Sequence, residues 1–177
     1  MPGKIILVLG GARSGKSSFA VELASGLGHK VLFCATAEPL DDEMRARIEA
    51  HKKTRPSSWT TLESATNIAA AIGKSSAGHD AVIIDCMTLL LSNLLGEGIP
   101  LSQCEQSVAR EMEELLTCLG KKESNYIIVS NEVGQGLVPE NGLARTYRDM
   151  LGKINQQLAA CADEVYLMVA RLPVKIK

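Results

Sequence analysis

Short, uninterrupted runs of apolar residues recur along the chain, and longer amphipathic stretches separate them. A run of about five aliphatic residues bounded by turn-forming residues is typical of a strand buried on both faces of a sheet. This pattern predicts strands at residues 5–9, 31–35, 81–85, 126–130 and 165–170.

The stretches between these runs carry apolar residues three and four positions apart, which is the spacing of one helical face. They predict helices at residues 16–27, 41–54, 64–72, 87–95, 101–119 and 143–160. Gly28 and Pro56 follow two of these helices as stop signals. Strands that alternate with helices favour an α/β fold, a mainly parallel sheet with helices on both faces. No repeat or linker-like segment divides the chain, so we expect a single domain over residues 1–177.

A phosphate-binding motif lies between the first predicted strand and the first predicted helix. The octapeptide Gly-Gly-Ala-Arg-Ser-Gly-Lys-Ser matches G-x-x-x-x-G-K-[ST] at each fixed position. Its backbone N–H groups and the following helix N-terminus favour phosphate, its lysine reaches the β- and γ-phosphates, and its last hydroxyl can bind Mg²⁺. The candidate nucleotide-binding residues are therefore Gly10, Gly11, Ala12, Arg13, Ser14, Gly15, Lys16 and Ser17. The motif predicts a P-loop NTPase-like fold that binds a nucleoside triphosphate; a purely structural glycine turn is the alternative.

Asp85 is a second candidate metal ligand beside Ser17. It ends the apolar run Ala-Val-Ile-Ile-Asp, and parallel strands bring their carboxyl ends to one edge of the sheet, where ligands bind. An acid at that edge can hold Mg²⁺ directly or through water. A turn-forming aspartate at a strand end is the alternative.

The composition of the chain argues against nucleic acids and membranes as binding partners. The 177 residues include 19 Lys and Arg against 20 Asp and Glu, for a net charge of −1, and only 3% are aromatic. This balance lacks the basic footprint of a duplex-binding domain and the aromatic platform of a single-strand binder, so we expect no nucleic-acid partner. The five cysteines show no CxxC pair, which favours reduced thiols in the cytoplasm. No apolar stretch is long enough for a signal peptide or a membrane span, so we expect no stable membrane insertion.

Several classes of triphosphate protein have further motifs that this chain lacks. It has no guanine-reading NKxD, no DxxG after a strand and no LSGGQ stretch. The sequence therefore disfavours a signalling GTPase and an ABC ATPase, and leaves a small-molecule kinase or a nucleotidyltransferase.

A distinctive set of short motifs extends beyond the phosphate loop. It comprises Ala-Thr-Ala-Glu at 35–38, Leu-Asp-Asp-Glu-Met at 40–44, Arg-Ile at 47–48, His-Lys at 51–52, Arg-Pro at 55–56 and Trp59, then Asn-Glu-Val-Gly at 131–134, Val-Pro-Glu at 138–140, Leu-Ala-Arg at 143–145, Arg-Asp at 148–149, Asn-Gln at 155–156, Ala-Asp-Glu-Val at 162–165 and Val-Lys-Ile-Lys at 174–177. Together with the phosphate loop, this set resembles the bifunctional adenosylcobinamide kinase / adenosylcobinamide-phosphate guanylyltransferase family of cobalamin assembly. The resemblance covers nearly the whole chain.

The resemblance implies two reactions on one scaffold. The first phosphorylates the aminopropanol hydroxyl of adenosylcobinamide with ATP or GTP. The second transfers GMP from GTP to adenosylcobinamide phosphate through a covalent GMP-histidine and releases pyrophosphate. The family also implies a homotrimer.

Matching the motif places the nucleophilic histidine at His51. An imidazole nitrogen is a competent nucleophile toward phosphorus, and a covalent intermediate divides one difficult step into two. The helical spacing of Met44, Ile48 and His51 by itself favours a partly buried structural histidine. The assignment therefore depends on the resemblance.

The resemblance implies further GTP contacts around this histidine. They are Ala35, Thr36 and Ala37 at the end of the second strand, Lys52, Lys53, Thr54 and Arg55 after the histidine, and the acids Glu63 and Asp85. Lysine and arginine suit triphosphate oxygens, and arginine can bind them in a bidentate manner. A solvated charge run is the alternative for the lysines, and a helix-entry carboxylate is the alternative for Glu63.

Fewer residues of the sequence indicate where the phosphate acceptor would bind. Asn131 and Glu132, at the end of the fourth strand, are placed to meet the acceptor or to orient water. Salt-bridged surface packing explains Arg145, Arg148 and Asp149 on the next helix at least as well as acceptor contacts do, so they are not among the candidate site residues.

Two other hypotheses stay open. One is a P-loop kinase for a different metabolite with a structural His51, and the other is a nucleotide-dependent binding or assembly protein without transfer chemistry. If the protein forms an acid-labile, base-stable adduct with α-labelled GTP, it is a guanylyltransferase and both of these alternatives are excluded.

Overall fold

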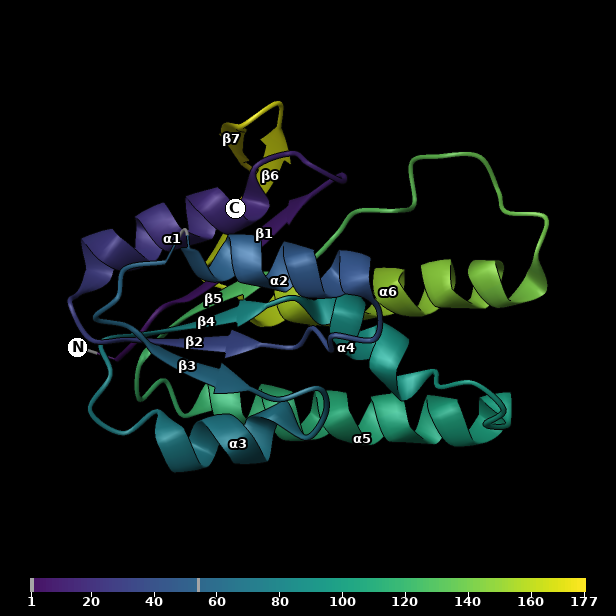
Figure 1. The fold of residues 1–177 in the computed structure, drawn as a ribbon, viewed down its shortest axis with the longest axis horizontal. Helices are drawn as coiled ribbons and strands as arrows, with labels where there is room; N and C mark the ends of the chain where they lie inside the picture. The colour runs from purple at the N-terminus through teal and green to yellow at the C-terminus, as the bar shows by residue number, and fades with distance from the viewer. Residues whose placement is uncertain (1, 54) are drawn as a thin grey trace.

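The computed structural model describes residues 2–53 and 55–177 (Figure 1). Its elements in chain order are β1 (Ile5–Gly10), α1 (Lys16–Leu27), β2 (Val31–Ala35), α2 (Asp42–Lys53), β3 (Thr60–Glu63), α3 (Ile68–Ser75), β4 (Ala81–Asp85), α4 (Met87–Leu94), α5 (Leu101–Gly120), β5 (Asn125–Val129), α6 (Gly142–Cys161), β6 (Glu164–Val169) and β7 (Leu172–Lys175).

Within these residues the strands form one seven-stranded sheet in the order β3-β2-β4-β5-β1-β6-β7. Every neighbouring pair is parallel except β6 and β7, which form an antiparallel hairpin. The register places Ala35 opposite Asp85 and Asp85 opposite Val129. The carboxyl ends of β1, β2, β4 and β5 therefore lie along one edge, as the sequence predicts.

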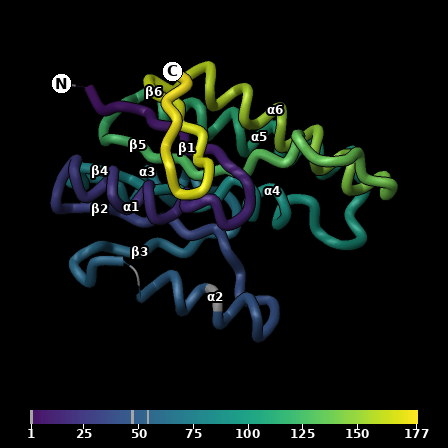
Figure 2. The backbone as a smooth tube through the Cα atoms, turned by 90° about the horizontal axis from the view of Figure 1, so that it is seen from above, coloured from purple at the N-terminus to yellow at the C-terminus, as the bar shows by residue number. Residues whose placement is uncertain are grey.

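Side chains of the central strands alternate between two apolar cores. Ile5 and Leu7 pack with residues of α3, α4, α5 and α6, whereas Ile6 and Val8 pack with Ala20 and its neighbours on α1. Both faces of the sheet are thus covered (Figures 1 and 2). The predicted mainly parallel sheet with helices on both faces is confirmed.

A buried carboxylate fixes one of these helices to another. Glu111 of α5 is only 4% exposed, and its two oxygens accept hydrogen bonds from the main-chain N–H groups of Asn67 and Ile68 at 2.7 and 2.8 Å. Those N–H groups open α3 and have no partner within that helix. Glu111 therefore caps α3 from a distant part of the chain.

α2 differs from the other helices in its packing. It stands apart from the sheet and from α1 in Figure 2. None of its described side chains is fully buried, and its exposed surface is highly charged. Few contacts therefore hold α2 in this position.

The sequence prediction missed two edge strands and misplaced one helix start. β3 and β7 are four residues long and largely exposed, so neither contains a buried apolar run. α3 begins at Ile68 instead of residue 64, because the capping carboxylate of Glu111 meets the chain there. It ends at Ser75 instead of residue 72, because helical hydrogen bonding continues past Gly73 to the N–H of Ser76, which donates to the carbonyl of Ile72. The other predicted elements agree with the structure to within one residue at either end, and the part of the predicted second helix at Thr54 lies outside the described residues.

Candidate active site

The phosphate loop occupies the turn between β1 and α1. The ammonium of Lys16 donates a 2.6 Å hydrogen bond to the carbonyl of Gly11 and lies 3.5 Å from Ser14 Oγ, and the residue is only 8% exposed. Gly15 has a φ of 94°, in the left-handed region that favours glycine. A Cβ on Gly10 would lie 2.6 Å from Ser14 Oγ, so this position also requires glycine. The loop thus folds tightly around its own lysine, whose charge it directs inward.

The turn between β6 and β7 supports this loop from the other end of the chain. The N–H of Arg171 donates a 2.9 Å hydrogen bond to the carbonyl of Ser14. A Cβ on Gly15 would lie 3.0 Å from Arg171 Cγ, so the two segments are in close contact. Sequence reasoning missed this contact, since no motif links Arg171 to the loop.

The ends of β2 and β4 are joined by a buried polar network. The N–H of Thr36 donates to the carbonyl of Asp85 at 3.1 Å, and the Thr36 hydroxyl donates to the carbonyl of Cys86 at 2.7 Å. The Asn93 side-chain amide donates to the carbonyl of Thr36 at 2.8 Å. The structure therefore brings the segment 35–37 and Asp85 together, with Asn93 as a support that the sequence did not indicate.

The donor set at this edge fits a magnesium ion that is bound mainly by phosphate oxygens. Ser17 and Asp85 are both half-buried and supply a hydroxyl and a carboxylate oxygen, the ligand chemistry that Mg²⁺ prefers. Among the described residues, no group of three or more His, Cys, Asp or Glu side chains is clustered in a way that could hold a metal. A metal here would depend on the nucleotide for most of its ligands.

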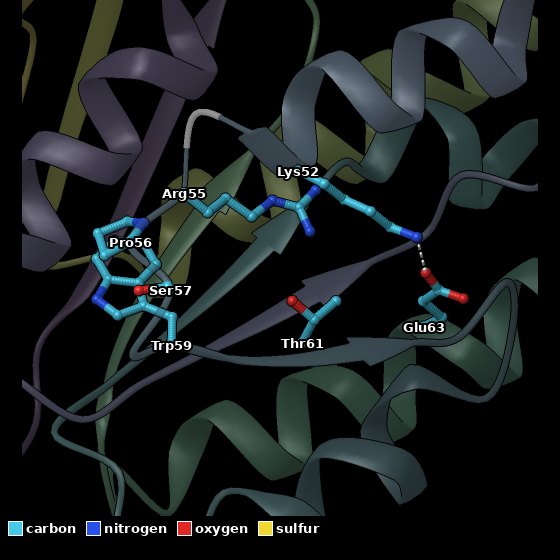
Figure 3. A pocket seen from close by; sticks show the side chains of 7 residues that line it. All are labelled: Lys52, Arg55, Pro56, Ser57, Trp59, Thr61 and Glu63. Carbon is cyan, nitrogen blue, oxygen red and sulfur yellow. Dashed lines mark ion pairs between the residues drawn. The ribbon is translucent and has the colours of Figure 1, made fainter.

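A second set of predicted residues lies at the end of α2. His51 is half-buried in its last turn, and Lys53 is exposed. The Lys52 ammonium pairs with Glu63 of β3 at 2.9 Å and with Glu49 at 3.3 Å (Figure 3). Hydrogen bonds to Glu63 and Glu49 raise the pKa of Lys52. The predicted contact residue Thr54 lies outside the described residues.

Arg55 is the unusual cation of this region. Its guanidinium lies 3.6 Å from the centroid of the Phe33 ring, and its Nε and Nη1 atoms are buried without a hydrogen-bond partner. Burial lowers the pKa of Arg55, while the charges of Asp85 and Glu63 act in the opposite direction. A buried cation with two unpartnered N–H donors is the kind of group that an oxyanion would satisfy.

Arg55 lines an open pocket of about 500 Å³, and Figure 3 shows the side chains that line this pocket. Its lining residues are Lys52, Arg55, Pro56, Ser57, Trp59, Thr61 and Glu63. The pocket combines two cations, one carboxylate and one indole ring. Its charged residues Lys52, Arg55 and Glu63 are all among those that the sequence assigned to GTP, whereas Ser57, Trp59 and Thr61 are not.

The structure therefore forms two groups of candidate residues. One contains the phosphate loop, the segment 35–37 and Asp85, and the other contains α2, Arg55 and Glu63. Figure 2 shows α2 on the side of the molecule away from the loop between β1 and α1. The two groups meet along β2, because Ala35 lies opposite both Asp85 and Glu63 and the guanidinium of Arg55 lies over Phe33.

The end of β5 completes the edge beside the phosphate loop. The N–H of Glu132 donates to the carbonyl of Gly10 at 3.0 Å. Both main-chain groups of Asn131 are held by side chains, its N–H by Thr88 Oγ1 at 3.1 Å and its carbonyl by the Asn155 amide at 2.9 Å. Asn131 is thus placed rigidly next to the loop that would hold the phosphates.

The two arginines of α6 donate hydrogen bonds to main-chain carbonyls, and the ion pairs of the described residues include neither of them. Arg145 donates to the carbonyls of Pro139 and Glu140 at 2.9 and 2.6 Å. Arg148 donates to the carbonyls of Gly134 and Leu137 at 2.7 and 3.1 Å. Both side chains hold the connection between β5 and α6.

None of the helices in the described parts of the chain has the length and the hydropathy that crossing a bilayer requires.

Comparisons with known proteins bear on the fold and on the family of this chain. A crystal structure of the RadB recombinase matches 94% of this chain and 74% of its own length with a TM-score of 0.50 and 16% identity, a likeness of fold alone that supports the predicted P-loop NTPase-like architecture. The family model described as cobinamide kinase / cobinamide phosphate guanyltransferase matches residues 6–176. Among curated relatives, the bifunctional adenosylcobalamin biosynthesis protein CobU of Salmonella typhimurium is 44% identical over 98% of this chain and 99% of its own. Its Escherichia coli counterpart is 42% identical over the same shares, and CobP of Pseudomonas aeruginosa is 42% identical over 97% of this chain and 96% of its own. The chain therefore belongs to the cobinamide kinase / cobinamide phosphate guanyltransferase family of transferases, and the resemblance drawn from its motifs is confirmed.

Proposed function

We propose that this chain phosphorylates the aminopropanol hydroxyl of adenosylcobinamide with ATP or GTP, and then transfers GMP from GTP to adenosylcobinamide phosphate. The observation that carries the proposal is the buried Lys16 ammonium inside a complete phosphate loop, in a chain that matches the family over residues 6–176. The relatives that match along their full length are named as bifunctional proteins of adenosylcobalamin biosynthesis, which supports both reactions.

In the kinase reaction, the phosphate loop would bind the triphosphate through its main-chain N–H groups and Lys16. The acceptor hydroxyl oxygen attacks the γ-phosphorus, and the nucleoside diphosphate leaves. Positioning and charge stabilisation supply most of the catalysis in such transfers. Asn131, fixed beside the loop, is placed to orient the acceptor.

Ser17 and Asp85 are the residues that would hold Mg²⁺. When bound, this ion neutralises phosphate charge and orients the triphosphate.

In the guanylyltransferase reaction, we propose His51 as the nucleophile. An imidazole nitrogen forms a bond to the α-phosphorus of GTP, the bond to the β-phosphate oxygen breaks, and pyrophosphate leaves. The proposed contacts to this GTP are Ala35, Thr36, Ala37, Lys52, Lys53, Thr54, Arg55, Glu63 and Asp85. The two unpartnered donors of Arg55 support an oxyanion in this region.

The position of α2 has a consequence for this second reaction. Because α2 stands apart from the loop between β1 and α1 in Figure 2, we propose that His51 moves toward a GTP that is bound by the phosphate loop of the same chain. The ion pair between Lys52 and Glu63 is exposed, and pairs of this kind stabilise a structure only weakly. It would offer little resistance to a movement of α2.

We also propose a cytoplasmic homotrimer, as the resemblance and the free cysteines suggest. Light scattering of the purified protein would give its mass in solution.

The test of the proposed function follows the two reactions in parallel. Wild type incubated with α-labelled GTP should retain the label after denaturation, in an adduct that is acid-labile and base-stable. His51→Ala should lose the label and the GDP-linked product but still phosphorylate adenosylcobinamide, because the kinase reaction needs no imidazole. His29→Ala is the matched control, since His29 is exposed and lies two residues before β2. Label retention together with GDP-linked product in His51→Ala would place the nucleophile elsewhere.

A further inference from the structure

Glu132 lies just after β5, next to the first residue of the phosphate loop. Its main-chain N–H donates a 3.0 Å hydrogen bond to the carbonyl of Gly10, and β5 runs parallel to β1 with Val129 opposite Val8. The residue is half-buried. Ligands of a parallel sheet bind outside the carboxyl ends of its strands. The side chain of Glu132 therefore begins at the edge of the sheet where the triphosphate would lie.

The carboxylate of Glu132 is held by the chain that follows it. Its Oε1 atom accepts a 2.6 Å hydrogen bond from the N–H of Gly134, and a Cβ on Gly134 would lie 2.8 Å from the same oxygen. Glycine is thus the residue that admits the carboxylate at this distance, which explains the spacing Glu-Val-Gly in the motif at 131–134. In the described part of the chain, Oε2 accepts no hydrogen bond and is able to receive a proton.

The main chain on both sides of Glu132 is fixed as well. The Ser130 hydroxyl donates to Asn155 Oδ1 at 2.6 Å, both residues are buried, and the Asn155 amide donates to the carbonyl of Asn131 at 2.9 Å. On the other side, Arg148 donates to the carbonyl of Gly134 at 2.7 Å. The carboxylate therefore has a defined position, and a group placed in advance needs little reorganisation when a substrate binds.

The charge of Glu132 has no evident structural use. The ion pairs of the described residues do not include it. A glutamine would accept the same hydrogen bond from Gly134 without the charge. A negative charge beside the phosphate loop also repels a triphosphate, so it does not favour binding of the nucleotide. A fixed carboxylate in such a place fits a group that accepts a proton.

We propose that Glu132 is the general base of the phosphorylation reaction; the two reactions themselves rest on the proposed function. Oε2 takes the proton of the acceptor hydroxyl while the hydroxyl oxygen forms its bond to the γ-phosphorus. The bond between the γ-phosphorus and the bridging oxygen breaks, and the nucleoside diphosphate leaves with that electron pair. The proton then passes from Glu132 to solvent.

The second reaction has no need of this base. Its acceptor is a phosphate monoester, whose second pKa is about 6, so its oxygens are largely deprotonated at pH 8. Such an oxygen attacks phosphorus without losing a proton. Glu132 therefore serves phosphorylation alone, whereas the proposed nucleophile His51 serves guanylyl transfer alone.

Glu132→Gln tests this division of roles at pH 8. Phosphorylation is followed with adenosylcobinamide and γ-labelled ATP, and guanylyl transfer with GTP and adenosylcobinamide phosphate supplied directly. The kcat of phosphorylation should fall about 10²-fold or more, the usual contribution of a general base, while guanylyl transfer stays near wild type. The Kd of a non-hydrolysable ATP analogue should be unchanged or lower, because a repelling charge is removed. Glu140→Gln, an exposed carboxylate on the same connection, is the matched control and should leave both reactions unchanged.

Gly134→Ala tests the placement of the carboxylate without removing it. The added Cβ displaces Oε1, the end of a flexible side chain, so the variant should fold and melt like wild type. It should lower the kcat of phosphorylation and leave guanylyl transfer unchanged. Gly136→Ala is its control, since a Cβ on Gly136 meets nothing within 4 Å.

Three outcomes would overturn the proposal or its basis. Phosphorylation at the wild-type rate in Glu132→Gln shows that the proton goes elsewhere. An equal loss of both reactions, with weaker binding of the ATP analogue, shows that Glu132 supports the nucleotide site and is not a base. Wild-type protein that binds the analogue but phosphorylates no adenosylcobinamide refutes the proposed function itself, a result distinct from failure of Glu132 as the base.

Discussion

Arg55 offers a direct test of the candidate nucleotide site. Its surroundings suggest that its side chain contributes to GTP binding more than to the stability of the folded protein. Its Nε and Nη1 atoms are buried without partners, while its guanidinium stacks on Phe33. We predict that Arg55→Met weakens GTP binding strongly and changes the stability of the nucleotide-free protein only slightly.

The expected magnitudes follow from these contacts. A hydrogen bond to a charged group contributes about 1.5–3 kcal/mol, so the loss of one such bond to a phosphate oxygen raises the Kd of GTP roughly 10- to 150-fold. In the free protein, removing unsatisfied donors gains about 1–3 kcal/mol, and losing the contact with the aromatic ring costs about 0.5–2 kcal/mol. These terms nearly cancel, so the melting temperature should change by less than about 4 °C.

Isothermal titration with GTP and thermal unfolding without nucleotide measure the two effects. Arg110→Met is the matched control, since Arg110 is exposed on α5 and lies on a different surface groove. A wild-type affinity for GTP in Arg55→Met would remove Arg55 from the site. A large drop in melting temperature would show instead that the guanidinium is a structural group.

Three further predictions concern the phosphate loop, the metal and acid stability. Lys16→Ala should lose most triphosphate affinity and both activities while keeping its circular dichroism spectrum, and near-normal GTP binding by the folded variant would refute the role of Lys16. Asp85→Asn should show a weaker dependence of activity on Mg²⁺ with nucleotide binding partly retained, and an unchanged Mg²⁺ titration would argue against Asp85 as a ligand. Hydrogen bonds from Tyr166, Lys4 and Lys175 lower the pKa of Glu164 to about 2, so this carboxylate stabilises the fold above its unfolded pKa of about 4.3 and loses that contribution as the pH falls toward 2. Urea unfolding should therefore show a shallower loss of stability between pH 5 and pH 2 in Glu164→Gln than in wild type, and identical slopes would contradict the assignment.

The sequence by itself determined the sheet core and the phosphate loop. β1, β2, β4 and β5 are continuous apolar runs because both of their faces are buried, and such runs are visible without any knowledge of their neighbours. The phosphate loop is equally local, since its glycines and lysine act within eight consecutive residues. The family was also recognisable, because its motifs consist of residue types at short spacings.

Only the tertiary structure determined the two edge strands, the start of α3 and the contacts that hold Arg55 and the phosphate loop. β3 and β7 form because a parallel or antiparallel neighbour offers its main-chain groups, and their own residues carry little signal. The start of α3 depends on Glu111, more than forty positions further along the chain. The unpartnered donors of Arg55 are buried because its guanidinium lies over Phe33. Arg171 reaches the phosphate loop because the turn between β6 and β7 lies against that loop. Each of these features arises from contacts between segments distant in sequence, whose free energy depends on packing geometry that a linear pattern does not contain.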